Sequence, residues 1–170
     1  MILKRLPDDI ETQVQELLGT FDGYKVQKHP GESVEWGFQL VGEPEKRGEI
    51  KGIMEVYQPK GRTDYVALTQ KVELEDSMVD MLGQLSEASL AQLYFELMTE
   101  TYRSNCDITI GFDLRIPKWF RIGMMIYADA LSQDTFVYRV NKIHNTVGLL
   151  LAILNRAALN YSKKPIPDQV

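Results

Sequence analysis

Residues 108–126, ITIGFDLRIPKWFRIGMMI, contain the pattern on which the fold prediction depends. Apolar side chains occupy alternate positions in two runs, and this period of two is typical of strands with one buried face. Pro117 and Lys118 separate the two runs, which indicates an antiparallel hairpin. The inward side chains are Ile108, Ile110, Phe112 and Leu114 in the first run, and Phe120, Ile122, Met124 and Ile126 in the second.

Helical patterns lie on both sides of this hairpin. Before it, Asp76 and Ser86 are candidate caps of helical segments that reach Tyr102. After it, residues 132–154 carry one apolar stripe at helical spacing. We expect these helices to cover the buried face of the sheet.

The N-terminal half continues the same order of patterns. A helical stripe runs from Ile10 to Phe21, and alternating segments follow. The segments with strand character are residues 24–28, 34–40, 50–58 and 66–74. The sequence therefore predicts a single α+β domain over residues 1–162, with an antiparallel sheet of five to six strands and helices packed on one face. Residues 163–170 are expected to form a C-terminal tail.

Composition restricts the classes of function. The chain has 170 residues, of which 44% are hydrophobic, and its formal net charge is −5. A negative global field repels phosphate backbones and anionic lipids. Residues 1–7 lack the apolar core of a signal peptide, and the apolar run 147–154 is too short to cross a bilayer. We expect a cytoplasmic protein that binds neither nucleic acid nor membrane.

Motifs for chemistry are absent from the sequence. It contains no phosphate-binding loop, no dinucleotide fingerprint and no paired cysteines for zinc, so we expect no catalytic residue, metal or cofactor. Cys106 is interpreted as a small buried residue, His29 as an exposed loop residue, and His144 as a histidine at the margin of a helix stripe. A reactive thiol at Cys106 and a general base at His144 are the alternatives.

A set of aromatic and methionine side chains falls on the strand positions opposite to the buried ones. Such residues are enriched at protein interfaces, although scattered exposed apolar side chains are also normal. The candidate protein-binding face consists of Tyr57, Tyr65, Trp119, Met125 and Tyr127. The basic residues Arg115, Lys118 and Arg121 near Trp119 give an alternative nucleic-acid surface.

The last helical segment is apolar on more than one face. Leu149 and Ile153 fall on the side opposite Val147 and Leu151 at 100° per residue. Either the helices pack on each other with this second face, or the face forms a subunit interface. Leu149 and Ile153 are thus candidate residues of a homodimer interface, since twofold homodimers are the commonest oligomers.

The order of elements resembles a known layout. The helix, the strands with the turn Tyr57-Gln58-Pro59-Lys60, the central helix, the strand pair, the Leu131-Ser132 entry and the long last helix span residues 8–161. This arrangement is similar to the type III secretion chaperone-like fold, and especially to an uncharacterised archaeal and bacterial family of that architecture. The resemblance implies a small, acidic, homodimeric protein without enzymatic activity that binds extended segments of client proteins.

Two functional hypotheses follow. The first is a homodimeric, non-enzymatic, chaperone-like or regulatory module that binds another polypeptide on a sheet face or a helix groove. The alternative is a small-ligand-binding protein or enzyme, with a pocket between sheet and helices. Residues such as Trp36, Tyr102 or His144 would line that pocket.

Overall fold

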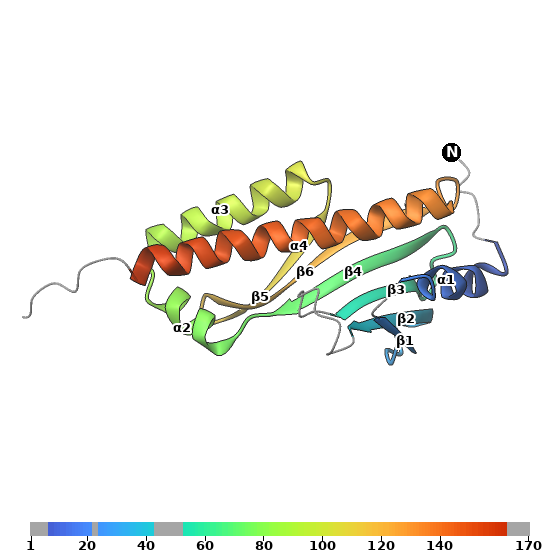
Figure 1. The fold of residues 1–170 in the computed structure, drawn as a ribbon, viewed down its shortest axis with the longest axis horizontal. Helices are drawn as coiled ribbons and strands as arrows, with labels where there is room; N and C mark the ends of the chain where they lie inside the picture. The colour runs from blue at the N-terminus through green and yellow to red at the C-terminus, as the bar shows by residue number, and fades with distance from the viewer. Residues whose placement is uncertain (1–6, 22–23, 43–52, 163–170) are drawn as a thin grey trace, which may run out of the picture.

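The structure is a computed structural model that describes residues 7–21, 24–42 and 53–162. These residues form a six-stranded antiparallel sheet and four helices (Figure 1). The helices are α1 (Ile10–Leu18), α2 (Asp76–Gly83), α3 (Glu87–Arg103) and α4 (Gln133–Ser162). The strands are β1 (Tyr24–Lys28), β2 (Val34–Gly42), β3 (Ile53–Pro59), β4 (Tyr65–Glu73), β5 (Asp107–Asp113) and β6 (Ile116–Tyr127).

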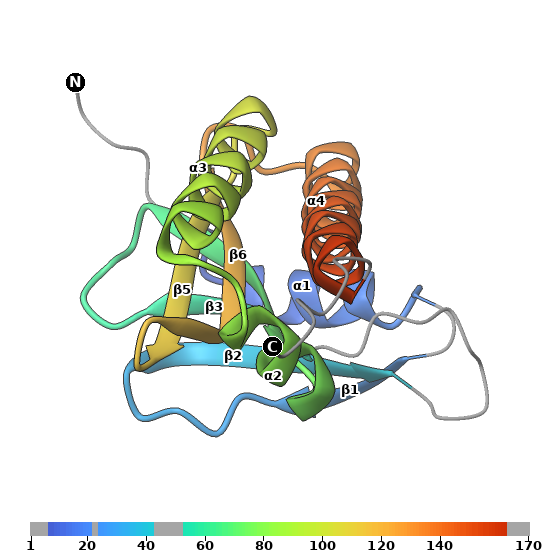
Figure 2. The same ribbon diagram turned by 90° about the vertical axis from the view of Figure 1, so that its left-hand side faces the viewer.

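The strand order across the sheet is β1-β2-β3-β4-β6-β5, and every pair is antiparallel. The helices lie on one side of this twisted sheet (Figures 1 and 2). α4 packs on β4 and β6, α1 on β2, and α3 on β5. The predictions of an α+β fold, of five to six antiparallel strands and of helices on one face are therefore confirmed.

The core lies between the helices and the sheet. α4 has 30 residues, which corresponds to a helix about 45 Å long. Its stripe buries Phe136, Ile143 and Leu150 completely. Ser86 caps α3 as expected, because its hydroxyl accepts a hydrogen bond from the backbone N–H of Ser89.

The register of the strands gives the sheet two chemically different faces. Paired residues project to the same side, so rows of neighbours cross the sheet. One row on the helix side runs through Val26, Leu40, Met54, Gln70, Ile122 and Ile108. The next row, on the opposite side, runs through Gln27, Gln39, Glu55, Thr69, Gly123 and Asp107.

The hairpin differs from the prediction at its turn. The chain reverses at Leu114 and Arg115, which have φ angles of 46° and 79°. Pro117 instead lies within β6 and pairs with Phe112. Two-residue hairpin turns need left-handed backbone conformations, which Asn and Gly usually supply. Residues 114 and 115 are Leu and Arg, so no turn motif marked this position.

The end of β5 also differs from the prediction. Ile108 and Ile110 pack against the core as predicted, but the pairing shifts between Gly111 and Phe112. The side chain of Phe112 is 53% exposed, and its ring lies edge-on to Tyr94 of α3 with the ring centres 5.4 Å apart. The expected start of the third strand at residues 50–52 and the expected tail at 163–170 lie outside the described residues.

Candidate functional site

The face of the sheet opposite the helices carries all five residues of the predicted protein-binding face. Tyr57 lies on β3, Tyr65 on β4, and the other three on β6. Alternation along each strand directs these side chains away from the helices, because their immediate neighbours Val56, Val66, Phe120, Met124 and Ile126 are buried on the helix side. All five residues therefore lie on one face, and their role in binding stays a prediction.

Four of the five residues are neighbours. Tyr57 pairs with Ala67, which pairs with Met125, and Tyr65 pairs with Tyr127. The Tyr65 and Tyr127 ring centroids are 5.8 Å apart. The guanidinium of Arg62 lies 4.7 Å from the centre of the Tyr65 ring. These contacts form one continuous aromatic surface across β3, β4 and β6.

Trp119 stands apart from that surface. It is six residues from Met125 along β6, which corresponds to about 20 Å in a strand. Lys71 covers it, with the ammonium nitrogen 5.1 Å from the ring centre. Gly111 on the neighbouring strand leaves room for the indole, because a Cβ at residue 111 would lie 2.0 Å from the Trp119 ring. The structure therefore separates Trp119 from the other four residues.

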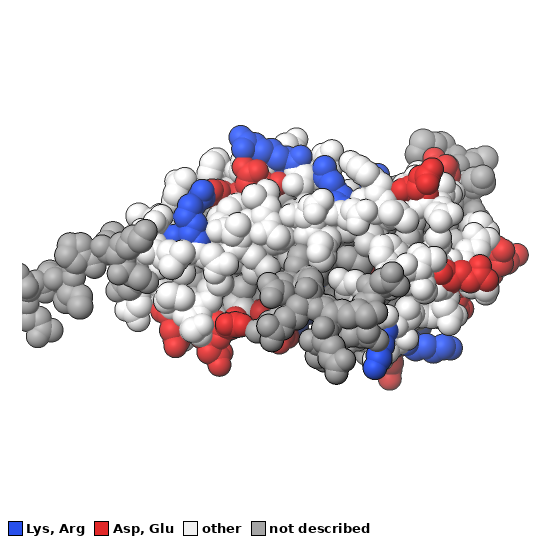
Figure 3. All heavy atoms as spheres, in the orientation of Figure 1, with Lys and Arg blue, Asp and Glu red and all other residues white. Residues whose placement is uncertain are grey.

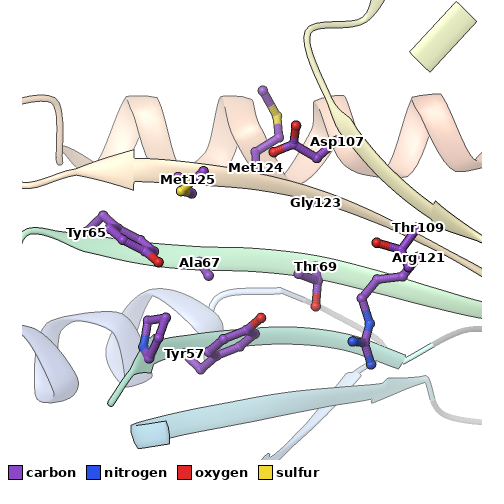
Figure 4. Close-up of a pocket in the computed structure, with 11 residues that line it drawn as sticks. Tyr57, Tyr65, Ala67, Thr69, Asp107, Thr109, Arg121, Gly123, Met124 and Met125 are labelled. Carbon is purple, nitrogen blue, oxygen red and sulfur yellow. The ribbon is translucent and has the colours of Figure 1, made fainter. Parts of the chain in front are cut away.

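A hollow of about 270 Å³ opens between the aromatic surface and Arg121 (Figure 4). Ala67, Thr69 and Gly123 are among its lining residues, and their small side chains leave the space free. Tyr57 and Arg121 border it. Burial raises the pKa of Tyr57, with the Arg121 charge opposing that effect, so the phenol keeps its proton at neutral pH.

Glu55 is the centre of a polar network beside the hollow. Its side chain is 12% exposed, and its carboxylate accepts hydrogen bonds from Gln39 Nε2 at 3.0 Å and from Thr69 Oγ1 at 3.3 Å. A terminal nitrogen of Arg121 lies 3.7 Å from the same carboxylate. The Nε of Arg121 is buried and has no hydrogen-bond partner among the described residues. The side chain as a whole is 40% exposed, so part of its guanidinium faces the hollow.

His29 lies in the loop after β1 as predicted, but it belongs to this network, so the prediction that it is exposed is wrong. Its Nδ1 accepts the backbone N–H of Gly31 at 2.9 Å, and its Nε2 lies 3.4 Å from Glu55. Only 13% of the side chain is exposed. The reason is Gly37, where a Cβ would lie 3.0 Å from the Cβ of His29 and 2.7 Å from that of Tyr57. The missing side chain lets these two residues close over β2.

The open face presents several groups that can make non-covalent contacts with a bound molecule. It offers aromatic rings, a thioether, a hydroxyl and a guanidinium donor around a shallow hollow. Serine and cysteine are absent from the hollow's described lining, and no group of three metal-ligating side chains occurs within the described ranges. Such an arrangement can accept a protruding side chain and donate hydrogen bonds to it.

A second cavity, of about 130 Å³, lies on the helix side of the sheet. His144 lines it, which agrees with the pocket hypothesis for this residue. Trp36 and Tyr102 do not line it. Trp36 donates a hydrogen bond from Nε1 to Gln58 Oε1 at 2.6 Å, and Tyr102 is 82% exposed on α3. The pocket hypothesis is therefore wrong for Trp36 and Tyr102, because the sheet register and the orientation of α3 place their side chains outside this cavity.

The titration of His144 gives a testable pH dependence. Burial lowers the pKa of His144 below its ordinary value near 6.5. Above pH 6.5 the imidazole is neutral in both the folded and the unfolded chain, so its titration leaves the free energy of unfolding unchanged. As pH falls below it, the unfolded chain takes up the proton first, so the free energy of unfolding decreases, by at most about 1.4 kcal/mol per pH unit. Between the two pKa values, urea unfolding should show a weaker pH dependence in His144→Gln than in the wild type. Parallel pH profiles of the two proteins would contradict this expectation.

The two residues of the predicted subunit interface have different environments. Leu149 is 41% exposed on α4, whereas Ile153 is 5% exposed and belongs to the core. α3 runs beside α4 at this level, and an ion pair joins Arg156 to Glu96. Ile153 is therefore removed from the candidate interface, and Leu149 stays a predicted member. Uncharged side chains cover much of the face over α4 (Figure 3).

The outer face of α3 carries apolar side chains that nothing within the described parts of the chain covers. Phe95 and Met98 are 69% and 52% exposed, and Tyr102 follows one turn later. Leu93 and Leu97 on the opposite face are buried. This helix thus has two apolar sides, and its packing on α4 and β5 decides which one faces out.

The basic residues of the alternative nucleic-acid surface are paired with carboxylates, which weakens the case for nucleic-acid binding. Arg115 pairs with Glu87, Lys118 lies 4.0 Å from Asp113, and Arg121 faces Glu55, so each basic side chain meets a carboxylate.

Burial raises the pKa of the Cys106 thiol, whose sulfur lies 3.6 Å from Thr146 Oγ1. The interpretation of Cys106 as a small buried residue is confirmed.

Gln70 and Glu55 are the site residues that sequence reasoning missed. The alternation through Val66, Leu68, Val72 and Leu74 skips residue 70, and this interruption was the available signal for Gln70. Glu55 occupies an ordinary outward strand position, and its neighbours in space come from β2, β4 and β6. No pattern in the local sequence indicates that these residues lie close together in the fold.

Comparison with known proteins identifies a family and a fold. The model of the family described as "Uncharacterized conserved protein (DUF2299)" matches residues 10–154. The crystal structure of an uncharacterized protein from Methanothermobacter thermautotrophicus is similar, with a TM-score of 0.74 and 11% identity over 86% of this chain and 96% of that chain. At that identity the likeness shows a shared fold alone. No curated protein matches the chain, and no helix in the described part is long and apolar enough to span a membrane.

Proposed function

We propose that this chain, which belongs to the DUF2299 family of uncharacterized conserved proteins, is a non-enzymatic cytoplasmic module that binds an extended segment of another protein. The observation that carries the proposal is the open face of the sheet. Tyr57, Tyr65, Met125 and Tyr127 form an aromatic surface there, next to a hollow of about 270 Å³. The helices leave this face uncovered.

The chemistry of the face favours a polypeptide as the bound molecule. Tyrosine, methionine and arginine are enriched at protein interfaces, since they bury much area at low entropic cost or donate several hydrogen bonds. The hollow is broad and shallow, with small side chains at Ala67 and Gly123, so it fits one protruding side chain of a partner. The Arg121 side chain is 40% exposed and borders the hollow, so its guanidinium can donate to a partner's carbonyl or carboxylate oxygen.

The polar network prepares the face for binding. Glu55 accepts hydrogen bonds from Gln39 and Thr69 and lies 3.7 Å from Arg121, and these contacts limit the motion of the side chains at one end of the hollow. A face that is already ordered loses less conformational entropy when a partner binds. The chaperone-like role implied by the resemblance to type III secretion chaperones belongs to the same proposal, because those proteins hold extended client segments.

We also propose that the chain is a homodimer. Support comes from exposed apolar side chains on the helix side, at Leu149 on α4 and at Phe95 and Met98 on α3. Contiguous exposed apolar surface is a common feature of subunit interfaces. The dimer would leave the open sheet face free, since these side chains lie on the other side of the molecule.

A random linear peptide library, displayed on phage and panned against the full chain, tests the binding proposal. We expect enriched peptides whose affinity, measured by fluorescence anisotropy, falls about tenfold or more for Tyr65→Ser. The physical reason is the loss of a ring that contacts Tyr127 and Arg62. Tyr138→Ser is the matched control, because Tyr138 is 59% exposed on α4, away from the open face.

Two results would refute the binding proposal. One is the absence of any enriched peptide. The other is a set of binders with equal affinity for the wild type and Tyr65→Ser, which would place their site on another surface. A change of affinity in Tyr138→Ser alone would direct attention to α4 instead.

A further inference from the structure

Gln70 interrupts a row of apolar side chains on the buried face of the sheet. Its cross-strand neighbours are Met54 on β3 and Ile122 on β6, and the row continues to Leu40 and Ile108. The residue is 3% exposed, and its Oε1 atom is buried without a hydrogen-bond partner among the described residues. A buried acceptor without a partner destabilises a protein relative to an apolar residue of similar shape. Oε1 is itself inaccessible, so a donor group removes this penalty once the side-chain amide of Gln70 rotates toward it.

The side chain of Gln70 lines the cavity of about 130 Å³ between α4 and the N-terminal part of the sheet. Leu40, Met54 and Gln70 form its floor, as adjacent members of one cross-strand row. The remaining lining residues are Phe21, Tyr24, Val140, Asn141 and His144. Asn141 is exposed, so the cavity reaches the surface beside α4.

The size and the lining restrict what the cavity can hold. An apolar cavity of about 150 Å³ binds a molecule such as benzene. Five of the eight described lining residues are aromatic or aliphatic, and none carries a permanent charge. Transfer of an ion into such surroundings costs far more than transfer of a neutral molecule. The best fit is therefore a neutral ring-sized compound.

We propose that this cavity binds a small uncharged molecule with an apolar ring and one hydrogen-bond donor, and that the donor is held by Gln70 Oε1. The ring packs between Met54 and the aromatic side chains at Phe21 and Tyr24. Asn141 and His144 supply polar groups at the α4 wall. The site lies on the opposite side of the sheet from the proposed polypeptide-binding face and is independent of it.

Phenol and toluene are the probes for this proposal. They have nearly the same shape, but only phenol has a donor. Titration calorimetry on the full chain should show that both compounds bind. The phenol-to-toluene affinity ratio should be at least tenfold higher for the wild type than for Gln70→Met, because Met keeps the side-chain length and removes the acceptor. Gln92→Met is the control, since Gln92 is exposed on α3; it should keep the wild-type ratio.

A second measurement needs no variant. In a spectrum of ¹³C-labelled methionine methyl groups, phenol should shift the Met54 signal and leave that of Met98, which is exposed on α3, unchanged. The proposal is overturned if neither probe binds, which would mean that water alone meets Gln70. It is also overturned if the phenol-to-toluene ratio is the same in Gln70→Met as in the wild type. Loss of peptide binding in Tyr65→Ser with phenol binding retained would keep the two sites distinct.

Discussion

Replacement of Ile153 by aspartate is expected to unfold the protein at room temperature, whereas the same change at Leu149 leaves it folded. Ile153 is 5% exposed within the core, so the substitution places a carboxylate among apolar side chains and removes their contacts. Burial of an unpaired charge costs several kcal/mol, and we expect a loss of about 4 kcal/mol or more. A domain with a stability of about 5–15 kcal/mol retains little native state after such a loss.

Leu149 provides the matched control because it lies one turn earlier on α4 and is 41% exposed. Substitution there is expected to change the free energy of unfolding by less than about 1 kcal/mol. Circular dichroism and urea unfolding measure both effects. Light scattering on Leu149→Asp also tests the proposed dimer, which should dissociate to monomers. A folded Ile153→Asp protein would contradict the assigned packing of α4, and a Leu149→Asp protein of wild-type size would exclude Leu149 from the interface.

Gly37→Ala should destabilise the protein by about 1–3 kcal/mol, the range typical of overpacking in a tight site. A Cβ at residue 37 would lie 2.7 Å from the Cβ of Tyr57, 3.0 Å from that of His29 and 3.1 Å from the carbonyl oxygen of Val56. A rotamer change cannot relieve contacts with Cβ and backbone atoms. Strands β2 and β3 must therefore separate, and this displaces His29 from Glu55.

The substitution Gly148→Ala is expected to have the opposite effect on stability from Gly37→Ala. Gly148 lies within α4, and a Cβ built there meets no atom within 4 Å outside the adjacent backbone. Alanine is favoured over glycine in a helix interior, so Gly148→Ala should stabilise the protein by about 0.5–1 kcal/mol. Thermal and urea unfolding compare the two variants. Equal and small effects of Gly37→Ala and Gly148→Ala would show that His29 and Tyr57 do not close over β2.

The fold was largely predictable because local patterns encode it. Alternation in β2, β4 and β6 fixed which side chains face the helices, and the stripe from Phe136 to Leu154 fixed the buried side of α4. The turn at Leu114 and Arg115 was not predictable, since neither residue type favours the left-handed conformation that it adopts. The partial exposure of Phe112 was not predictable either, because its ring contact is with Tyr94 on α3, a different element of the fold.

The candidate sites were likewise predictable from the sequence only in part. The five outward residues from Tyr57 to Tyr127 were assigned to one face by parity alone, yet the separation of Trp119 from the others depends on its position along β6. The network around Glu55 and the cavity at Gln70 bring together residues from several strands and from α4. Sequence distance says nothing about such contacts.

By itself, the sequence determined the order of helices and strands, the buried side of most strand positions and the single layer of helices, because periodicity is a property of neighbouring residues. The tertiary structure alone decided that α3 runs beside α4 near Ile153 while Leu149 remains exposed, and that Gln70, whose side-chain oxygen lacks a partner among the described residues, lines a cavity. These facts depend on the relative position of elements that are far apart in the chain. Packing between such elements is set by shape and register, which the spacing of residue types along the chain does not record.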